Sequence, residues 1–309
     1  MKSFTIAIPA YRRPQALRGL LEELAETPDL VRLCNVLVVD DGGLEDVSLG
    51  ERASDVPWSQ FGELEVRYVR HATNQGYART LIRLFRETDT PWMIQLADDD
   101  RLYSDGVRAL SQTIEDSASG VGVDVVTSPF IVGDRSLRHR SQVGRLSIKE
   151  ALTMNGHAPG VAYRVEAVRP QLTLLEERLE RGCTMAHTYP QVVLLLGLLL
   201  EHDGVVVFQR EAIAGEGPLA GPASLKDISG ASYGSFAARL RQLVDLETLL
   251  DGFERTEERE LIRRHGRRRT LNWILTEDPS LRGRILRDAG LRELSRAFGK
   301  ALMRRLAKR

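Results

Sequence analysis

The feature that most constrains the fold is an alternation of short apolar segments and helical segments over roughly the first 130 residues. Between the apolar segments, apolar residues recur every three or four positions, as Leu17, Leu20, Leu21 and Leu24 do. The apolar segments span residues 4–8, 35–39, 64–69, 92–96 and 123–127, and the helical ones residues 14–24, 77–87 and 105–115. Strands that alternate with helices form a mostly parallel sheet with helices on both faces. We therefore predict an α/β fold built on a doubly wound, mostly parallel sheet.

Polar, loop-forming residues follow three of these predicted strands, at 9–12, 40–42 and 98–100. In such sheets ligands bind outside the carboxyl ends of the strands. The last group is Asp98, Asp99 and Asp100, the Asp triplet. If the fourth strand continued through it, Asp98 and Asp100 would share one side and could hold a hard cation on phosphate oxygens. An isolated triplet is more often a solvated acidic turn, but three polar strand ends together favour a site.

Several classes of protein are disfavoured by what the sequence lacks. It contains neither GxGxxG after the first strand nor GxxxxGK[ST], so the usual dinucleotide fold and a P-loop nucleotidase are not expected. Cys34 and Cys183 are too few for a disulfide framework, and we expect free thiols. The first residues lack a signal-peptide layout, and the apolar run at 192–200 is about half of what spans a bilayer. We expect a cytoplasmic protein.

Charge separates the chain into two predicted parts. The net charge is zero, yet the residues from 253 onward carry nine excess positive charges. We predict one domain over residues 1–220 and a helical, basic C-terminal section over 221–309, with a packing stripe through Leu240, Leu243 and Leu246. A basic amphipathic helix can lie on an anionic membrane, although a solvated helix face is the more frequent case. Aromatic residues are scarce in this section, which argues against nucleic-acid binding.

Four motifs give the sequence a resemblance to a known family. They are Ile8-Pro9-Ala10-Tyr11-Arg12-Arg13-Pro14, Val38-Val39-Asp40-Asp41-Gly42, Asn74-Gln75-Gly76-Tyr77 and Leu96-Ala97-Asp98-Asp99-Asp100-Arg101-Leu102. In this order and spacing the sequence resembles family 2 glycosyltransferases, which have the GT-A nucleotide-sugar-binding fold. The resemblance covers residues 3–130 well and 145–215 loosely. The block at 187–191 resembles bacterial O-antigen sugar transferases of the abequosyltransferase type.

The resemblance implies roles for the polar strand ends. The nucleotide pocket would be lined by Pro9, Ala10, Tyr11 and Arg12, with Asp40 and Asp41 on the base and ribose and with Asn74, Gly76 and Arg79 beside the nucleotide. The Asp triplet would be the DXD-type element that holds Mg²⁺ or Mn²⁺ on the donor diphosphate. Asp98 and Asp99 would contact the donor, Asp99 and Asp100 would ligate the metal, and Asp100 would be a catalytic residue together with His187. Ala97 occupies the first position of the family pattern, so which aspartate is the principal ligand stays open.

The acceptor hydroxyl needs a general base, for which His187 is the candidate. Many members of the family place an acidic residue before the helix that corresponds to residues 189–201, where this chain has Ala186 and His187. A histidine titrates in the useful pH range without tuning. His187 is also compatible with metal ligation or a structural role, and Glu176 and Glu177 are fallback bases.

The resemblance thus implies a metal-dependent and inverting glycosyltransferase. It would use a nucleotide diphosphate sugar and a saccharide, lipid-linked or small-molecule acceptor, at the inner face of the membrane if the basic section binds there. The alternatives are a non-catalytic nucleotide-sugar-binding protein on the same fold and a sugar nucleotidyltransferase. The second would need a Gly-rich, Arg-bearing loop after the first strand, which residues 9–12 are not.

Overall fold

The computed structural model describes residues 2–42, 45–46, 51–52, 61–118, 122–138, 140, 142–218 and 236–276. The chain forms two compact units, one of residues 1–177 with 189–222 and one of residues 178–188 with 223–309. The domain boundary expected at residue 220 stays a prediction, because residues 219–235 lie outside the described part.

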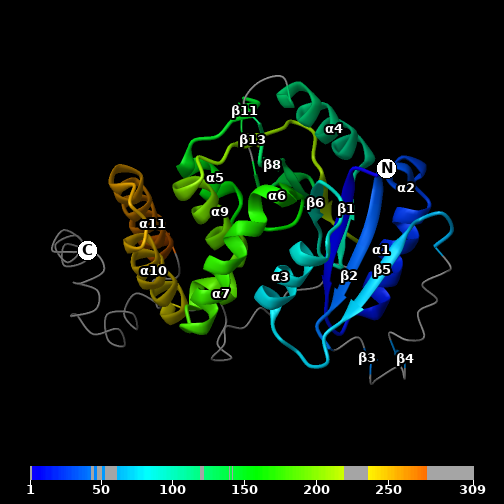
Figure 1. The fold of residues 1–309 in the computed structure, drawn as a ribbon, viewed down its shortest axis with the longest axis horizontal. Coiled ribbons are helices and arrows are strands. Elements are labelled where there is room, and N and C mark those ends of the chain that lie inside the picture. The colour runs from blue at the N-terminus through cyan, green and yellow to red at the C-terminus, as the bar shows by residue number, and fades with distance from the viewer. Residues whose placement is uncertain are drawn as a thin grey trace. The chain divides into compact units, whose positions relative to one another are not determined.

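The first unit is built on an eight-stranded sheet (Figure 1). Its strands, in spatial order, are β11 (Gly144–Arg145), β13 (Val206–Phe208), β8 (Val125–Thr127), β12 (Val161–Arg164), β6 (Trp92–Gln95), β1 (Phe4–Ala10), β2 (Cys34–Asp40) and β5 (Val66–Arg70). Strand β12 runs antiparallel to β6 and β8, and β11 runs antiparallel to β13; the other neighbouring pairs are parallel. The predicted α/β architecture with a mostly parallel sheet is confirmed.

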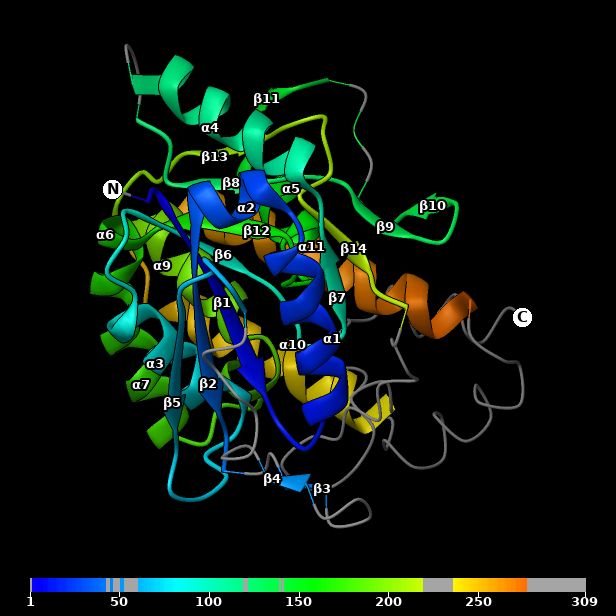
Figure 2. The same ribbon diagram turned by 90° about the vertical axis from the view of Figure 1, so that its right-hand side faces the viewer.

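Helices cover both faces of this sheet (Figure 2). On one face lie α1 (Pro14–Ala25), α2 (Pro28–Leu33) and α4 (Ser104–Ala118); on the other lie α3 (Tyr77–Glu87), α6 (Val165–Val168) and α9 (Pro190–Glu201). The remaining helices of this unit are α5 (Ile148–Met154), the 3₁₀ helix η3 (Arg169–Gln171) and the first part of α7 (Leu172–Glu180). The α1 stripe of Leu17, Leu21 and Leu24 packs with Ile6 and Ile8 of β1 in the core, as its spacing predicts.

A second, four-stranded sheet was not predicted. Its order is β10 (Arg135–Ser136), β9 (Phe130–Val132), β14 (Ala214–Glu216) and β7 (Asp100–Leu102). A separate two-stranded piece pairs β3 (Glu45–Asp46) with β4 (Glu51–Arg52). The second sheet brings residues 214–216 against the end of the Asp triplet, where Glu216 is opposite Asp100. Strands of two or three residues carry too little periodicity to be recognised in a sequence.

The second unit contains α8 (Thr184–Thr188), α10 (Phe236–Asp251) and α11 (Thr256–Thr276). Arginines of α11 pair with acidic residues of the same unit: Arg259 and Arg263 with Asp251, and Arg267 with Glu247. The terminal basic segment near residues 301–306 lies outside the described residues. Among the helices that the structure describes, none has the length and apolar character needed to cross a membrane.

Candidate active site

Neighbouring strand ends bring the predicted site segments together. In the parallel register of β1 and β2, Ala10 is opposite Asp40, and the Asp41 N–H donates to the Ala10 carbonyl at 2.9 Å. On the other side of β1, the Leu96 N–H donates to the Ala7 carbonyl at 3.1 Å. The segments 9–13, 40–42 and 96–100 therefore leave the same edge of the sheet side by side, as the polar strand ends predicted.

The Asp triplet follows the fourth predicted strand, as expected, and forms a turn that leads into a further strand. Asp98 and Asp99 lie in the turn, and Asp100 is the first residue of β7. The Asp100 N–H donates to the Ala97 carbonyl at 3.2 Å, and the Asp100 carboxylate accepts the Ala97 N–H at 3.0 Å. The simple alternation that would have placed Asp98 and Asp100 on one side does not apply to a turn.

Strand β14 and the residue after it form backbone contacts with the triplet. Glu216 is opposite Asp100 in the antiparallel pairing of β14 with β7, and the Gly217 N–H donates to the Asp99 carbonyl at 3.1 Å. A Cβ on Gly217 would lie 2.4 Å from the Asp99 carbonyl oxygen, so this approach requires glycine. The conformation of the triplet therefore depends on a segment more than 100 residues later in the sequence.

Arg13 is the cation that balances the triplet. Its two terminal nitrogens donate one to Asp98 Oδ1 and the other to Asp99 Oδ2. Burial raises the pKa of Asp98 to about 7, against the opposing effect of Arg13. Burial also raises the pKa of Asp100 to about 7, opposed by the Ala97 N–H and reinforced by Asp99 and Asp98. The site is thus a partly buried cluster of carboxylates with a single guanidinium across two of them.

Asp40 and Asp41 are buried and organise the neighbouring loops. The Tyr68 hydroxyl donates to Asp40 Oδ2 at 2.6 Å, and Arg70 Nε lies 3.4 Å from the same atom. Asp41 accepts the N–H groups of Gln75 and Gly76, one on each carboxylate oxygen, at 2.7 and 2.8 Å. Asp41 therefore shapes the loop that leads into α3, and the predicted base and ribose contacts of both residues stay predictions.

The remaining predicted nucleotide residues line the same edge. Tyr11 and Arg12 are exposed, and the Arg12 guanidinium carbon lies 5.0 Å from the centre of the Tyr11 ring. Arg12 adopts a left-handed backbone with φ of 56°, which turns the chain from β1 towards α1. Asn74 and Arg79 are exposed near the start of α3.

Pro9 and Gly76 complete the predicted set. Pro9 lies within β1, opposite Val39. Gly76 precedes α3 with φ of 84°, a conformation that disfavours other residues.

A buried polar layer lies beneath the triplet. Arg138 is buried and donates to Thr127 Oγ1 and the Ser128 carbonyl, at 3.2 and 3.1 Å, and to the Pro159 carbonyl. Burial lowers the pKa of Arg138 to about 10, and Tyr163 and Asp100 oppose this shift. Arg138 therefore points from the stretch 133–138 into the interior of the unit. His139 lies outside the described residues.

His187 belongs to the second unit and is described with it. It is half-buried on α8, and the Met185 N–H of that helix donates to Asp245 of α10 at 3.1 Å. Its role as general base stays a prediction. The fallback residue Glu176 pairs with Arg86 at 2.7 Å.

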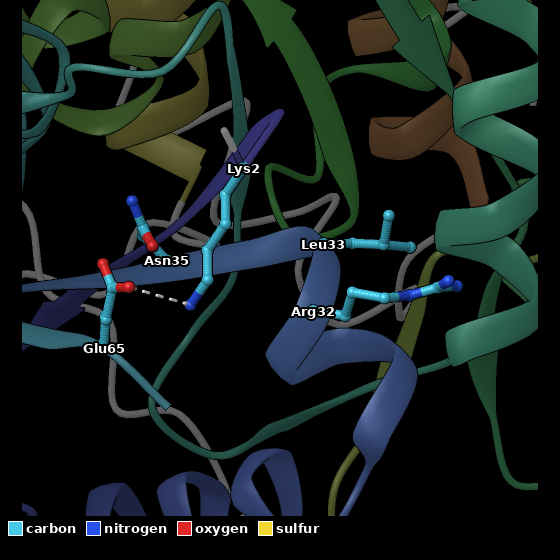
Figure 3. Close-up of a pocket in the computed structure, with 5 residues that line it drawn as sticks. All are labelled: Lys2, Arg32, Leu33, Asn35 and Glu65. Carbon is cyan, nitrogen blue, oxygen red and sulfur yellow. Dashed lines mark ion pairs between the residues drawn. The ribbon is translucent and has the colours of Figure 1, made fainter. Parts of the chain in front are cut away.

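A pocket of about 690 Å³ lies at the opposite end of the strands from the triplet. Figure 3 shows Lys2, Asn35 and Glu65 on its wall, with the Lys2 amine 3.5 Å from the Glu65 carboxylate. These residues precede or begin β1, β2 and β5, so the pocket is at the amino ends of the strands. Ligands of parallel sheets bind at the carboxyl ends, and we do not assign the pocket to the candidate site.

The triplet suits a metal ion that takes few ligands from the protein. Among the described residues, no three His, Cys, Asp or Glu side chains form a cluster that could enclose a metal. Mg²⁺ in phosphate-transfer sites typically takes one or two carboxylates and completes its shell with water and substrate phosphates. Asp98 Oδ2 is a buried oxygen without a hydrogen-bond partner, which is the kind of atom that such an ion would satisfy.

The comparison with known families decides the identity of the chain. The model of a family described as Glycosyl transferase family 2 matches residues 5–169, which include the four segments of the site edge. The chain belongs to glycosyl transferase family 2. No curated protein sequence matches it significantly.

Solved structures agree with a GT-A-type fold. Staphylococcus aureus TarS 1-349 superposes with a TM-score of 0.62 at 12% identity, over 98% of this chain and 82% of that one. The same protein in complex with UDP-GlcNAc gives 0.60 at 12% identity, over 100% and 83%. Mannosyltransferase PcManGT from Pyrobaculum calidifontis, in complex with GDP-Man and Mn²⁺, gives 0.50 at 14% identity, over 99% and 86%. At these identities the likeness concerns the fold, and the predicted GT-A fold class is confirmed.

Sequence reasoning missed several residues of this edge in the family 2 chain. Tyr68 and Arg70 extend from β5 to Asp40, Gly217 binds the backbone of the triplet, and Arg138 is buried where the charge of Asp100 acts on it. Arg13 carried a usable signal, since a second arginine follows Arg12 at the edge that receives three carboxylates. Nothing local in the sequence marks Gly217 or Arg138.

Proposed function

We propose that this protein is a metal-dependent, inverting glycosyltransferase that moves a sugar from a nucleotide diphosphate donor to an acceptor hydroxyl. The observation that carries the proposal is the Asp triplet at the sheet edge, beside the loops held by Asp40 and Asp41. Membership of family 2 supports the reaction class. The abequosyltransferase-type subclass, the donor sugar and the acceptor, whether saccharide, lipid-linked or small molecule, belong to the proposal.

The chain's own residues would bind and orient the donor. The exposed Tyr11 and Arg12 present a ring and a guanidinium to the nucleotide, and Gly76 lets the loop before α3 approach it closely. The Asp triplet would hold Mg²⁺ or Mn²⁺ through Asp99 and Asp100. When bound, such an ion neutralises the charge that develops on the leaving diphosphate.

The buried carboxylates of the triplet favour a nearby cation. Asp98 and Asp100 lose solvent on burial, so their carboxylates gain from a close positive charge. The acceptor hydroxyl must lose its proton to a general base, and His187 is our candidate for that base. Histidine is the side chain that most often serves as a general acid or base.

A donor screen tests the proposal. Purified protein is incubated with a panel of nucleotide sugars and Mn²⁺, with chelator as the control, and the released products are identified. We expect slow donor hydrolysis that yields a nucleoside diphosphate and stops when the metal is removed. Formation or consumption of pyrophosphate would instead identify a sugar nucleotidyltransferase. Binding without turnover across a range of acceptors would identify a non-catalytic nucleotide-sugar-binding protein.

A further inference from the structure

The position of Arg13 has a consequence for how metal and donor bind. Arg13 lies at the junction of the β1 loop and α1, directly before Pro14, which starts the helix. Its guanidinium lies between two different carboxylates, with one terminal nitrogen on Asp98 and the other on Asp99. The Arg13 side chain is 46% exposed, whereas those of Asp98 and Asp99 are 2% and 13% exposed. The guanidinium therefore covers the two carboxylates from the solvent side.

A divalent cation held by Asp99 and Asp100 would share Asp99 with this guanidinium and would lie close to Asp98. Both are positive, and both gain from the carboxylates that Arg13 now pairs with. Asp98 is only half satisfied in this arrangement, because its Oδ1 accepts from Arg13 while its buried Oδ2 has no partner. A metal ion that binds on these carboxylates lies close to the guanidinium, and the repulsion between the two cations weakens the Arg13 contacts.

The displaced guanidinium would not leave the site. Arg13 follows the segment 9–12 that we propose to line the nucleotide, and nearly half of its side chain faces solvent. Guanidinium groups bind phosphate oxygens in a two-pronged geometry, as they do carboxylates. A donor diphosphate bound at the triplet supplies new anionic partners close to the ones that Arg13 loses.

We propose that Arg13 is an exchangeable counter-ion, which holds Asp98 and Asp99 when the site is empty and transfers to the donor diphosphate when a divalent metal takes the carboxylates. This inference rests on the proposed metal-dependent function and adds a residue and an order of events to it. When the metal binds alone, the weakened Arg13 ion pairs reduce its affinity. When the diphosphate is also present, it gives Arg13 new anionic partners. Metal and nucleotide therefore each increase the affinity for the other by the same factor.

Opposite effects on the two ligands distinguish this role from a structural ion pair. We expect Arg13→Met to bind Mn²⁺ alone about three- to tenfold more tightly than the wild type, which is the range for a partly exposed ion pair. In the presence of saturating Mn²⁺, the same variant should bind UDP or GDP about tenfold more weakly, because a charge-assisted phosphate contact is lost. If the ion pair were structural, its loss would disorder the site and weaken the binding of both Mn²⁺ and the nucleotide.

The measurements are calorimetric titrations of Mn²⁺, with and without UDP or GDP. Arg108→Met is the matched control, because Arg108 is 49% exposed and also joins two carboxylates, Asp29 and Asp105, outside the site. It should leave both affinities unchanged. Arg13→Lys keeps the positive charge but lacks the two-pronged guanidinium, so we expect Mn²⁺ and nucleotide affinities between those of the wild type and Arg13→Met. This variant also provides the test if Arg13→Met folds poorly.

The possible outcomes separate this inference from the proposed function. Equal or weaker Mn²⁺ binding by Arg13→Met, with normal Mn²⁺ binding by the wild type, overturns the exchange and leaves the metal-dependent function standing. If the wild type binds UDP or GDP but no Mn²⁺ under any condition, the metal-dependent function fails and the exchange fails with it. Tighter Mn²⁺ binding together with weaker nucleotide binding by Arg13→Met supports both the exchange and the metal-dependent function.

Discussion

Individual residues around the triplet are held by burial as much as by charge. His157 packs edge-on against Phe130, with ring centres 4.4 Å apart, and lies close to the buried Arg138. Burial, with a further contribution from Arg138, lowers the pKa of His157 to about 4. The imidazole is therefore neutral in the folded protein at neutral pH, which suits a structural histidine behind the site and not a proton carrier.

This burial predicts a pH dependence of stability. The unfolded chain protonates His157 near its ordinary pKa of about 6.5, whereas the folded chain resists until about pH 4. Between these values the unfolded state binds more protons, so His157 lowers stability as the pH falls through this window. We expect the wild type to lose more stability than His157→Leu between about pH 7 and pH 5, measured by urea unfolding. A difference between the two proteins that does not change with pH contradicts the assignment.

The site residues whose location could be predicted from the sequence are those next to the end of a strand. Pro9, Asp40 and the Asp triplet each follow or end an apolar run, so their neighbourhood could be predicted from the order of elements alone. Their individual contacts could not. The Asp41 carboxylate binds the backbone of Gln75 and Gly76, more than 30 residues away, and no local pattern encodes such a partner.

At the level of elements, a second sheet determines the shape of the site. Strand β7 leaves the main sheet after the turn at Asp98 and Asp99 and pairs with β14, which in turn pairs with β9. These strands are two or three residues long, too short for periodicity to reveal, and their partners are far apart in the chain. By contrast, α1 and α3 show a full apolar stripe and were predicted within a residue or two. Helix α5 was missed, although Ser147 and Glu150 form a capping box at its start.

Gly217 provides a test of the support from β14. A methyl group there would lie 2.4 Å from the Asp99 carbonyl oxygen, so Gly217→Ala must displace the backbone of the triplet. We expect Mn²⁺-dependent binding of a nucleoside diphosphate to weaken about tenfold or more, by analogy with misplaced binding groups elsewhere. Gly122→Ala is the control, since no atom lies within 4 Å of the Cβ it would add. Unchanged metal-dependent binding in Gly217→Ala shows that β14 does not position the triplet.

For the whole molecule, part of the excess positive charge of the C-terminal section is paired with carboxylates of the same unit. The net charge is zero, and in the described part of the second unit Arg259, Arg263 and Arg267 face carboxylates of α10. The alternative between a membrane-binding face and a solvated helix face could not be settled from the sequence, because a charge count does not show where the partner charges lie. For these three arginines, the structure favours pairing within the unit.

This pairing predicts how the second unit responds to charge removal. Arg263 contacts Asp251 and Glu260, so Arg263→Gln should lower the free energy of unfolding, by up to about 1 kcal/mol for a partly exposed pair. Cosedimentation of the full chain with phosphatidylglycerol vesicles should not change. Arg264→Gln, at an exposed neighbouring position, is the control. A loss of vesicle binding in Arg263→Gln alone would assign Arg263 to a membrane contact.

The central claim is that the Asp triplet holds a divalent metal on the donor diphosphate. The most direct measurement is calorimetric binding of UDP and GDP to the Asp99→Asn, Asp100→Asn double variant, with and without Mn²⁺. Asp105→Asn is the control, because Asp105 lies close in sequence with a side chain that is 79% exposed. We predict that the increase in nucleotide affinity caused by Mn²⁺ is lost in the double variant and kept in the control. An undiminished effect of Mn²⁺ in the double variant would contradict the account.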